Sequence, residues 1–157
     1  MNIRSSFFVV ALASVLIASC AKQENKPAED TLKVTGDPRD PIIQAVKALN
    51  AQDTAAYAKT LNQTQLKFFR ENAAAITRGI GLLKGETLTP NIISSRLDST
   101  AKNVGFVKFS ITADGPVKVT GDTIEQQVFF EDGAWRQQWI FAALRPVMQA
   151  VQPKQKN

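Results

Sequence analysis

The sequence contains no histidine and only one cysteine, Cys20. Histidine is the commonest general base near neutral pH and the commonest metal ligand in proteins. Its absence excludes, for this chain alone, serine–histidine and cysteine–histidine nucleophilic catalysis and histidine-ligated zinc. A single cysteine also forms no disulfide within the chain. We therefore expect no catalytic residue, metal or cofactor, and only carboxylate, lysine, hydroxyl or substrate-assisted chemistry stays open.

Long apolar runs are also missing, except for the twelve residues Phe7 to Ala18, which Ser14 interrupts and basic Arg4 precedes. As a helix with a rise of about 1.5 Å per residue, this run spans roughly 18 Å. The hydrocarbon core of a membrane is ~30 Å thick, so a transmembrane anchor is not expected. A basic start followed by a short apolar run is typical of a secretory signal peptide, which we assign to residues 1–19.

The residues that end this segment, Leu16-Ile17-Ala18-Ser19-Cys20, place an aliphatic residue and two small ones before the cysteine. This pattern resembles the lipobox of bacterial lipoproteins, although Ile17 replaces the commoner leucine. The resemblance implies diacylglyceryl attachment to the Cys20 sulfur, removal of residues 1–19 and acylation of the new amino group. Two or three acyl chains anchor a protein durably, whereas one binds reversibly. The alternative is an ordinary signal peptide cleaved near Ala18 or Ser19, leaving a free thiol.

Residues 20–39 are rich in Lys, Gln, Glu, Asn and Pro, and Leu32 and Val34 are their only aliphatic residues larger than alanine. This composition predicts a flexible tether after the lipidated Cys20. Ala21 follows the cysteine, where the enterobacterial sorting rule has aspartate for retention in the inner membrane. We therefore expect an outer-membrane anchor with the protein facing the periplasm. Residues 153–157 are expected to form a disordered tail.

Charge gives little indication of a polyanionic partner. Removal of residues 1–19 takes away only Arg4, so the mature chain has 18 basic and 14 acidic residues, a net charge of +4. The charges alternate in sign along the C-terminal half and form no basic run of the kind that follows phosphates. We therefore expect no nucleic-acid partner.

Residues 40–152 are enough for one folded domain, which the periodicity predicts to begin with three helices. The first starts at Asp40-Pro41, where we expect the Asp40 side chain to cap the helix, and ends near Asn50. Asp53-Thr54 starts a second. Thr64 is expected to cap a third, longer helix. Its apolar face consists of Leu66, Phe69, Ala73, Ile76, Ile80 and Leu83.

After Gly85 the pattern changes to alternating β-branched and aromatic residues separated by turn signals. Four strands are predicted: 92–100, 104–113, 117–130 with a bend at Gly121-Asp122, and 135–141 with Trp135, Gln137, Trp139 and Phe141 on one face. A short or kinked helix follows over 142–151, because it contains Pro146. The predicted fold is α+β, with N-terminal helices packed on a curved four-stranded antiparallel sheet and a short C-terminal helix.

Two stretches carry a resemblance to a known superfamily. The helix and break of residues 45–57, AVKALNAQDTAAY, and the hairpin of residues 128–136, VFFEDGAWR, are similar to the opening and closing segments of nuclear transport factor 2-like, cystatin-like cone domains. The resemblance extends over most of residues 40–141 and is closest to small lipoprotein branches of uncharacterised function. It implies a pocket between the curved sheet and the helices.

Four aromatic residues are the candidates for a pocket or a partner surface. Tyr57 is the only tyrosine, and the ketosteroid isomerases of this superfamily use a tyrosine with aspartates, but the sequence places no aspartate opposite it. Phe68 is adjacent to Phe69 and must point away from the apolar face of its helix. Trp135 and Trp139 belong to an aromatic group that either lines a pocket or packs in the core.

These patterns lead to one leading hypothesis and two alternatives. The leading hypothesis is a non-enzymatic envelope lipoprotein, anchored to the membrane through Cys20, that binds a small apolar ligand or a partner protein. The alternatives are a structural or assembly accessory of an envelope complex and a carboxylate-based isomerase or hydrolase. A homodimer formed through the sheet stays open. An apolar pocket of a few hundred Å³ would support the ligand hypothesis, and a filled interior would contradict it.

Overall fold

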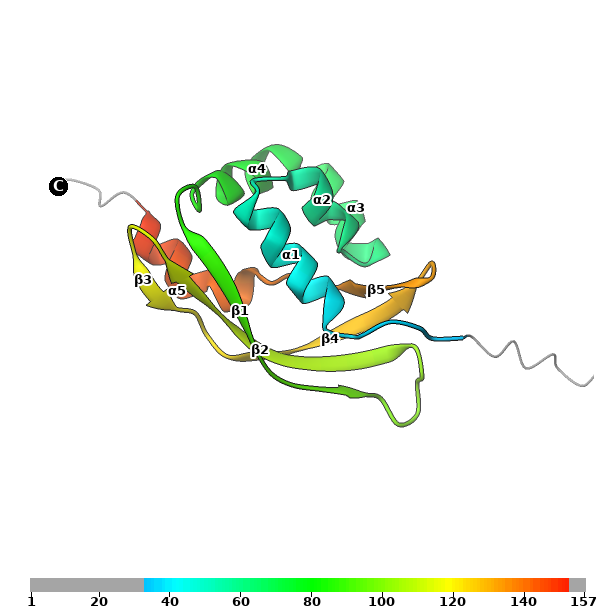
Figure 1. Ribbon diagram of the computed structural model, residues 1–157. Helices are drawn as coiled ribbons and strands as arrows, with labels where there is room; N and C mark the ends of the chain where they lie inside the picture. The colour runs from blue at the N-terminus through cyan, green and yellow to red at the C-terminus, as the bar shows by residue number, and fades with distance from the viewer. Residues whose placement is uncertain (1–32, 153–157) are drawn as a thin grey trace, which may run out of the picture. The chain divides into compact units, whose positions relative to one another are not determined.

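The structure is a computed structural model that describes residues 33–152 (Figure 1). Cys20, the expected signal peptide of residues 1–19, the tether up to residue 32 and the tail of residues 153–157 lie outside the described residues. The described chain forms helices first, then a strongly curled antiparallel sheet and a short C-terminal helix. The predicted α+β class is therefore confirmed. None of the described helices is long and apolar enough to cross a membrane.

Five helices are described, and the first shows how an apolar face directs packing. They are α1 (Asp40–Asn50), α2 (Thr54–Lys59), α3 (Gln63–Glu71), α4 (Ala73–Gly81) and α5 (Phe141–Val151). In α1, Ile42, Val46 and Leu49 recur on one face and are buried. The expected Asp40 side-chain cap is wrong, because Asp40 lies inside the helix and its carboxylate accepts a hydrogen bond from the Asp37 N–H, outside the helix.

The segment predicted as one long third helix is two helices, α3 and α4. Asn62, rather than Thr64, caps α3, since its side-chain oxygen accepts a hydrogen bond from the Gln65 N–H at 2.9 Å. The break falls at Asn72, whose side-chain amide donates to the Phe68 carbonyl at 3.0 Å. A short amide side chain that bonds the preceding carbonyls competes with helix continuation, and this ends α3 within the apolar pattern.

The sheet contains five strands, of which four form the main path in the order β1-β2-β4-β5, and β3 pairs with β2. They are β1 (Thr87–Leu97), β2 (Val104–Asp114), β3 (Lys118–Thr120), β4 (Ile124–Glu131) and β5 (Ala134–Gln137). The predicted single strand of residues 117–130 is therefore two strands, separated at Gly121-Asp122-Thr123. Both pair with the same edge of β2, with Thr120 opposite Thr112 and Ile124 opposite Phe109.

The fourth predicted strand is shorter than expected. It ends at Gln137, so Trp139 lies in the following connection and Phe141 begins α5. The Gln137 N–H donates to the Thr60 carbonyl and its carbonyl accepts from the Asn62 N–H, so the α2–α3 connection pairs with the end of β5. The first strand begins earlier than predicted, at Thr87, and ends at Leu97.

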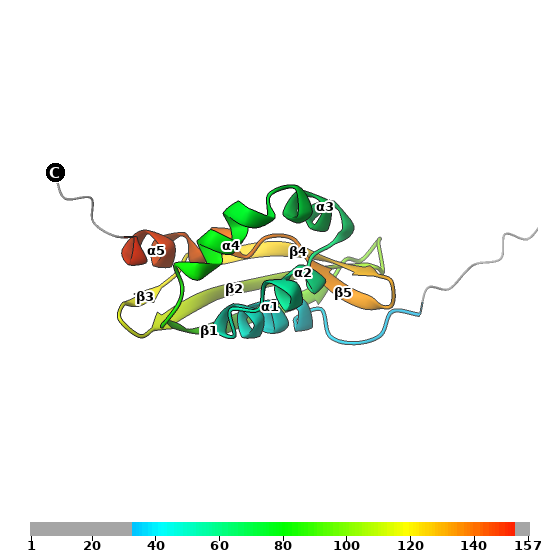
Figure 2. The same ribbon diagram turned by 90° about the horizontal axis from the view of Figure 1, so that it is seen from above.

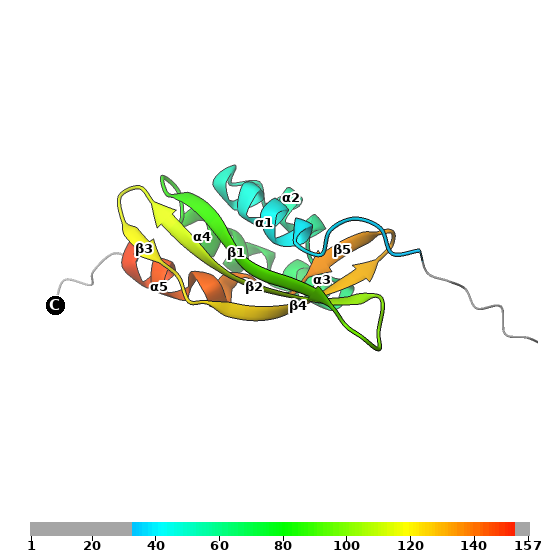
Figure 3. The same ribbon diagram turned by 60° about the horizontal axis from the view of Figure 1, so that its bottom comes forward.

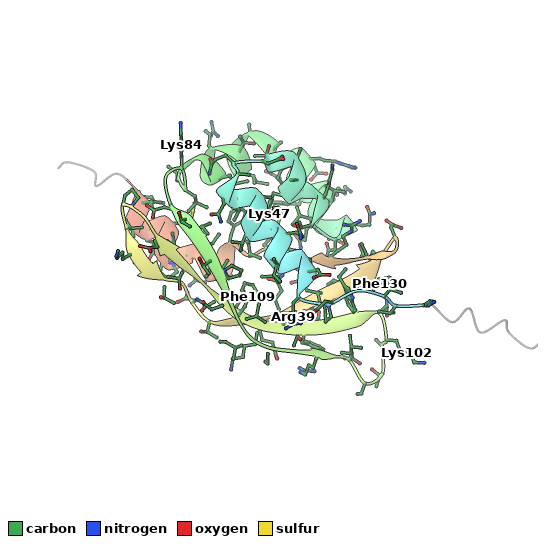
Figure 4. All side chains as sticks on the ribbon, in the orientation of Figure 1. Arg39, Lys47, Lys84, Lys102, Phe109 and Phe130 are labelled. Carbon is green, nitrogen blue, oxygen red and sulfur yellow. The ribbon has the colours of Figure 1, made fainter. Side chains whose placement is uncertain are left out.

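Helices α1 to α4 cover one face of the sheet (Figure 2), and β1, β2 and β4 leave the opposite face uncovered (Figure 3). Alternate residues of β2 point toward the helices and are buried. Figure 4 shows Phe109 in this layer, between α1 and the sheet. The core residues on this strand are Val107, Phe109, Ile111 and Ala113.

The segment before α1 is part of the folded unit. Val34 packs against the core, and a Cβ placed on Gly105 of β2 would lie 3.1 Å from the Pro38 Cβ. Gly36 has a φ of 82° and lies close to Trp135. Residues 33–39, which the sequence assigns to the tether, therefore lie against the domain.

Candidate functional site

An aromatic cluster occupies the space between α2, α3 and the start of α5. Tyr57 is fully buried at its centre, with its ring centroid 6.4 Å from that of Trp139, 5.6 Å from that of Phe141 and 6.3 Å from that of Phe69. Phe68 lies at the outside of the cluster, edge-on to Trp139 at 5.7 Å and 51% exposed. Three of the four predicted site residues thus meet in one group.

Buried polar side chains adjoin this cluster. Gln137 is fully buried, its amide nitrogen donates to the Thr60 hydroxyl at 3.0 Å, and its amide oxygen lies 3.2 Å from the Gln126 amide nitrogen. The Tyr57 hydroxyl is buried and has no hydrogen bond of ordinary geometry to the described residues. Burial raises the pKa of Tyr57, and the nearby Gln137 side chain and Ile140 backbone only partly oppose this. The hydroxyl therefore stays protonated at physiological pH.

The centre of the layer between the sheet and the helices is filled. Tyr57, Phe109 and Val128 have no exposed surface, and none of the four main hollows in residues 33–152 is lined by them. No described carboxylate contributes to the shifted pKa of Tyr57. The arrangement gives this tyrosine the environment of a core residue with an aromatic neighbour on each side.

A pocket of about 430 Å³ lies at the N-terminal end of α1. Four separate segments meet there: the chain before α1, the first turns of α1, the end of α2 and the β4–β5 hairpin. Its lining residues are Thr35, Gly36, Asp40, Pro41, Gln44, Ala56, Lys59, Thr60, Gly133, Ala134, Trp135 and Arg136.

Trp135 is the predicted site residue that lies in this pocket, apart from the aromatic cluster. It is 5% exposed and packs edge-on against Phe130, with ring centroids 5.6 Å apart. Its indole N–H is buried and has no hydrogen-bond partner in residues 33–152. Arg136, next in the chain, donates to the Lys59 carbonyl at the end of α2 at 2.6 Å. Sequence analysis assigned no binding role to Lys59 or Arg136, because scattered charges show no pattern until the fold brings them together.

A second feature that the sequence did not indicate is the free edge of β1. This strand is at the end of the sheet order, and its second half is exposed. Ile93 and Leu97 are 57% and 53% exposed and are the two most exposed large apolar residues of the described chain. Near the start of the strand, the Asn50 amide bonds both the N–H and the carbonyl of Leu88 at 2.8 Å. The Asn50 side chain therefore protects the first half of this edge from pairing with another strand, whereas the second half is exposed.

Within the described residues, no group of three or more acidic or cysteine side chains is arranged to hold a metal ion. No family model matches this sequence, and no curated protein is significantly similar to it. The structural features that bear on function are therefore the filled core around Tyr57, the pocket beside Trp135 and the edge of β1.

Proposed function

We propose that this chain is an envelope lipoprotein, anchored to the outer membrane through Cys20, whose domain binds a partner protein at the edge of β1. The partner contributes an extended segment that pairs with residues 92–97 as an additional strand. Such β-strand addition gives affinity through main-chain hydrogen bonds and specificity through alternate side chains. The observation that carries the proposal is the unprotected second half of this edge.

The pairing pattern indicates which backbone groups of β1 point outward. The Asp98 N–H donates to the Val104 carbonyl at 2.8 Å, and the register continues with Arg96 opposite Phe106. Because hydrogen-bonded and non-hydrogen-bonded pairs alternate along antiparallel strands, Arg96 bonds β2 whereas Ser95 and Leu97 direct their N–H and carbonyl groups away from it. These groups are available to an incoming strand.

The first half of the same edge is closed. The Asn50 side chain satisfies both backbone groups of Leu88, and Pro90 has no N–H to offer. A register shift between Ile92 and Ser94 separates this half from the second. Proteins commonly protect exposed edges with such devices, so the contrast within one strand indicates that the second half is kept open for pairing.

The exposed side chains suit a protein partner. Ile93 and Leu97 supply the apolar contacts. Arg96 lies on the opposite face of the strand from Leu97, over the Phe106 ring, with its guanidinium carbon 4.0 Å from the centroid. The filled core leaves no space for a small apolar ligand around Tyr57. The same edge would also serve an assembly accessory of an envelope complex. In that case the partner protein is a component of the complex.

The proposal is tested by crosslinking in cells. The full chain is expressed with a photo-crosslinking residue at position 93, with and without the substitution Ser95→Pro. Proline removes the outward N–H of Ser95 but no hydrogen bond to β2, so we expect an unchanged fold and loss of a dominant crosslink to one envelope protein. The matched control is Ser95→Ala, which keeps the N–H and should keep the crosslink. Circular dichroism of both variants verifies the fold.

Two results would contradict the proposal. One is a folded Ser95→Pro variant with the same crosslinked product as the control. The other is a single product of twice the mass of the chain, because a second copy would then occupy the edge.

A further inference from the structure

We propose that the pocket between α1, α2 and the β4–β5 hairpin binds a small organic anion with an apolar body. This site is separate from the β1 edge and does not depend on the function proposed there. Its volume of about 430 Å³ falls in the range of small-molecule pockets, which is ~300–1,000 Å³. The charges and donors of its wall indicate which ligand it accepts.

Two cations line the pocket and have no carboxylate partner in the described chain. Neither Lys59 nor Arg136 takes part in an ion pair within residues 33–152. Arg136 uses one N–H on the Lys59 carbonyl at 2.6 Å, which fixes the guanidinium and leaves its other donors free. Asp40 is the one acid of the lining, so the wall carries a net charge of +1. An anionic group on the ligand would supply the missing counter-charge.

Trp135 provides an apolar ring edge to the pocket wall. Its indole N–H is buried without a partner, and a buried donor left unpaired is destabilising unless an acceptor reaches it. The neighbouring Cδ1 atom lies 3.7 Å from where a Cβ on Gly36 would stand, so this edge of the ring borders the pocket wall. The N–H itself has no exposed surface, so a ligand with a flat apolar body would contact the ring edge and place its anionic group on Lys59 and Arg136.

Glycine at position 36 lets the chain turn where it borders the pocket. Its φ of 82° is one that residues with a side chain rarely adopt, and a Cβ there would lie 3.8 Å from the Asp40 carboxylate and close to Trp135. Thr35 and Gly36, which precede α1, form part of the pocket wall. The pocket is therefore complete only in a protein that includes this segment. Ligand binding should therefore be measured on the full mature protein.

The test uses benzoate, benzamide and benzylammonium, three probes of similar size that carry negative, zero and positive charge. Each is titrated against the ¹⁵N-labelled mature lipoprotein in nanodiscs of phosphatidylcholine. The indole N–H signal of Trp135 is followed by NMR, with Trp139→Phe assigning it, since the chain has two tryptophans. We expect benzoate to shift this signal and to bind at least tenfold more tightly than benzamide, with benzylammonium weaker still.

The variants Arg136→Gln and Lys59→Gln should each weaken benzoate binding at least tenfold. The matched control is Lys102→Gln, which removes one positive charge from the exposed β1–β2 turn (Figure 4), a segment that does not line the pocket, and should leave binding unchanged. Equal affinities for benzoate and benzamide, or undiminished benzoate binding by both folded pocket variants, would overturn the proposal. Lys59 is exposed on α2, so Lys59→Gln is expected to fold. This variant therefore still tests the proposal if Arg136→Gln does not fold.

Discussion

At the scale of single residues, Gly121 shows how one missing side chain allows the sheet and α5 to meet. A Cβ at this position would lie 1.8 Å from the Ala143 carbonyl oxygen, a distance that no packing adjustment of a side chain can relieve. The Gly121 N–H donates to the Ile111 carbonyl at 2.8 Å, which holds the break between β3 and β4 against β2. The sequence indicated a bend here, and the approach of α5 explains why the residue is glycine.

Gly121→Ala is therefore expected to destabilise the domain. The backbone of α5 must move, and overpacking of this kind costs about 1–3 kcal/mol. Gly81→Ala is the control, because a Cβ there meets nothing within 4 Å and its φ is not left-handed. Urea unfolding of both variants measures the difference. Equal free energies of unfolding would show that α5 does not constrain this position.

Asp98 provides a prediction on pH. The Thr100 hydroxyl donates to its carboxylate at 2.6 Å, and the Ala101 and Thr100 N–H groups also bond it, which lowers the pKa of Asp98 to about 2. A depressed pKa in the folded state adds stability above the unfolded value of 3.8. This contribution is lost as the pH falls from 3.8 to about 2.

Thr100→Val removes the largest of these causes, so the pKa of Asp98 should rise toward 3.8. Carboxyl ¹³C chemical shifts followed during an acid titration measure it. Thr100→Ser keeps the hydroxyl and should keep the low value. A pKa that is the same in the valine variant and the original chain would assign the shift to the backbone groups alone.

At the scale of elements, the hydrophobic period predicted the type of nearly every helix and strand but not where each one ends. The start of α2 at Asp53 was predicted and is confirmed, since its carboxylate accepts from the Ala56 N–H at 2.8 Å. The break at Asn72 was missed because apolar residues continue at helical spacing through it. Periodicity reports which face is buried, whereas the termini depend on local side-chain hydrogen bonds.

The cap of α3 makes this distinction measurable. Asn62→Ala removes the hydrogen bond to the Gln65 N–H and should lower the free energy of unfolding by about 0.5–2 kcal/mol. Thr64→Ala, at the position that the sequence suggested, should change it by less than about 0.5 kcal/mol, because Thr64 lies exposed inside the helix. Thermal or urea unfolding compares them. A larger loss from Thr64→Ala would reverse the assignment of the cap.

At the scale of the whole molecule, the expected anchor determines where the two proposed binding sites act. The lipid on Cys20 stays a prediction, since this residue lies outside the described chain. Residues 33–39 pack against the domain, so the segment between Cys20 and Lys33 is shorter than the tether expected from the sequence. At about 3.3–3.6 Å per residue, the thirteen residues from 20 to 32 reach at most roughly 45 Å. A lipid on Cys20 would then hold the start of the domain within roughly 45 Å of the membrane surface.

Cys20→Ala is expected to move the protein from the membrane fraction to the soluble periplasmic fraction or to leave it unprocessed. Loss of the acyl chains removes about 0.8 kcal/mol of membrane affinity per buried methylene, and no described helix replaces them. Cell fractionation, with intact mass measurement of the original protein, checks this. An unmodified Cys20 thiol in the mature protein would favour the ordinary signal peptide instead.

The sequence by itself determined the α+β class, the exclusion of histidine chemistry and the expectation of a lipid anchor. These depend on composition, local motifs and periodicity, which are properties of neighbouring residues. Of the candidate sites, it indicated Trp135, but it also grouped Trp139 with it on one strand. Trp139 instead follows that strand, stacks on Tyr57 and is half-buried beside a different hollow.

Only the tertiary structure decided which surfaces are available for binding. The pocket combines Gly36, Lys59 and Arg136 from three segments far apart in the chain, and no local pattern records such a meeting. The edge of β1 is free because of its place in the strand order and because Asn50 covers only its first half. Both features arise from contacts between segments far apart in the chain. The local sequence around each of these residues does not reveal such contacts.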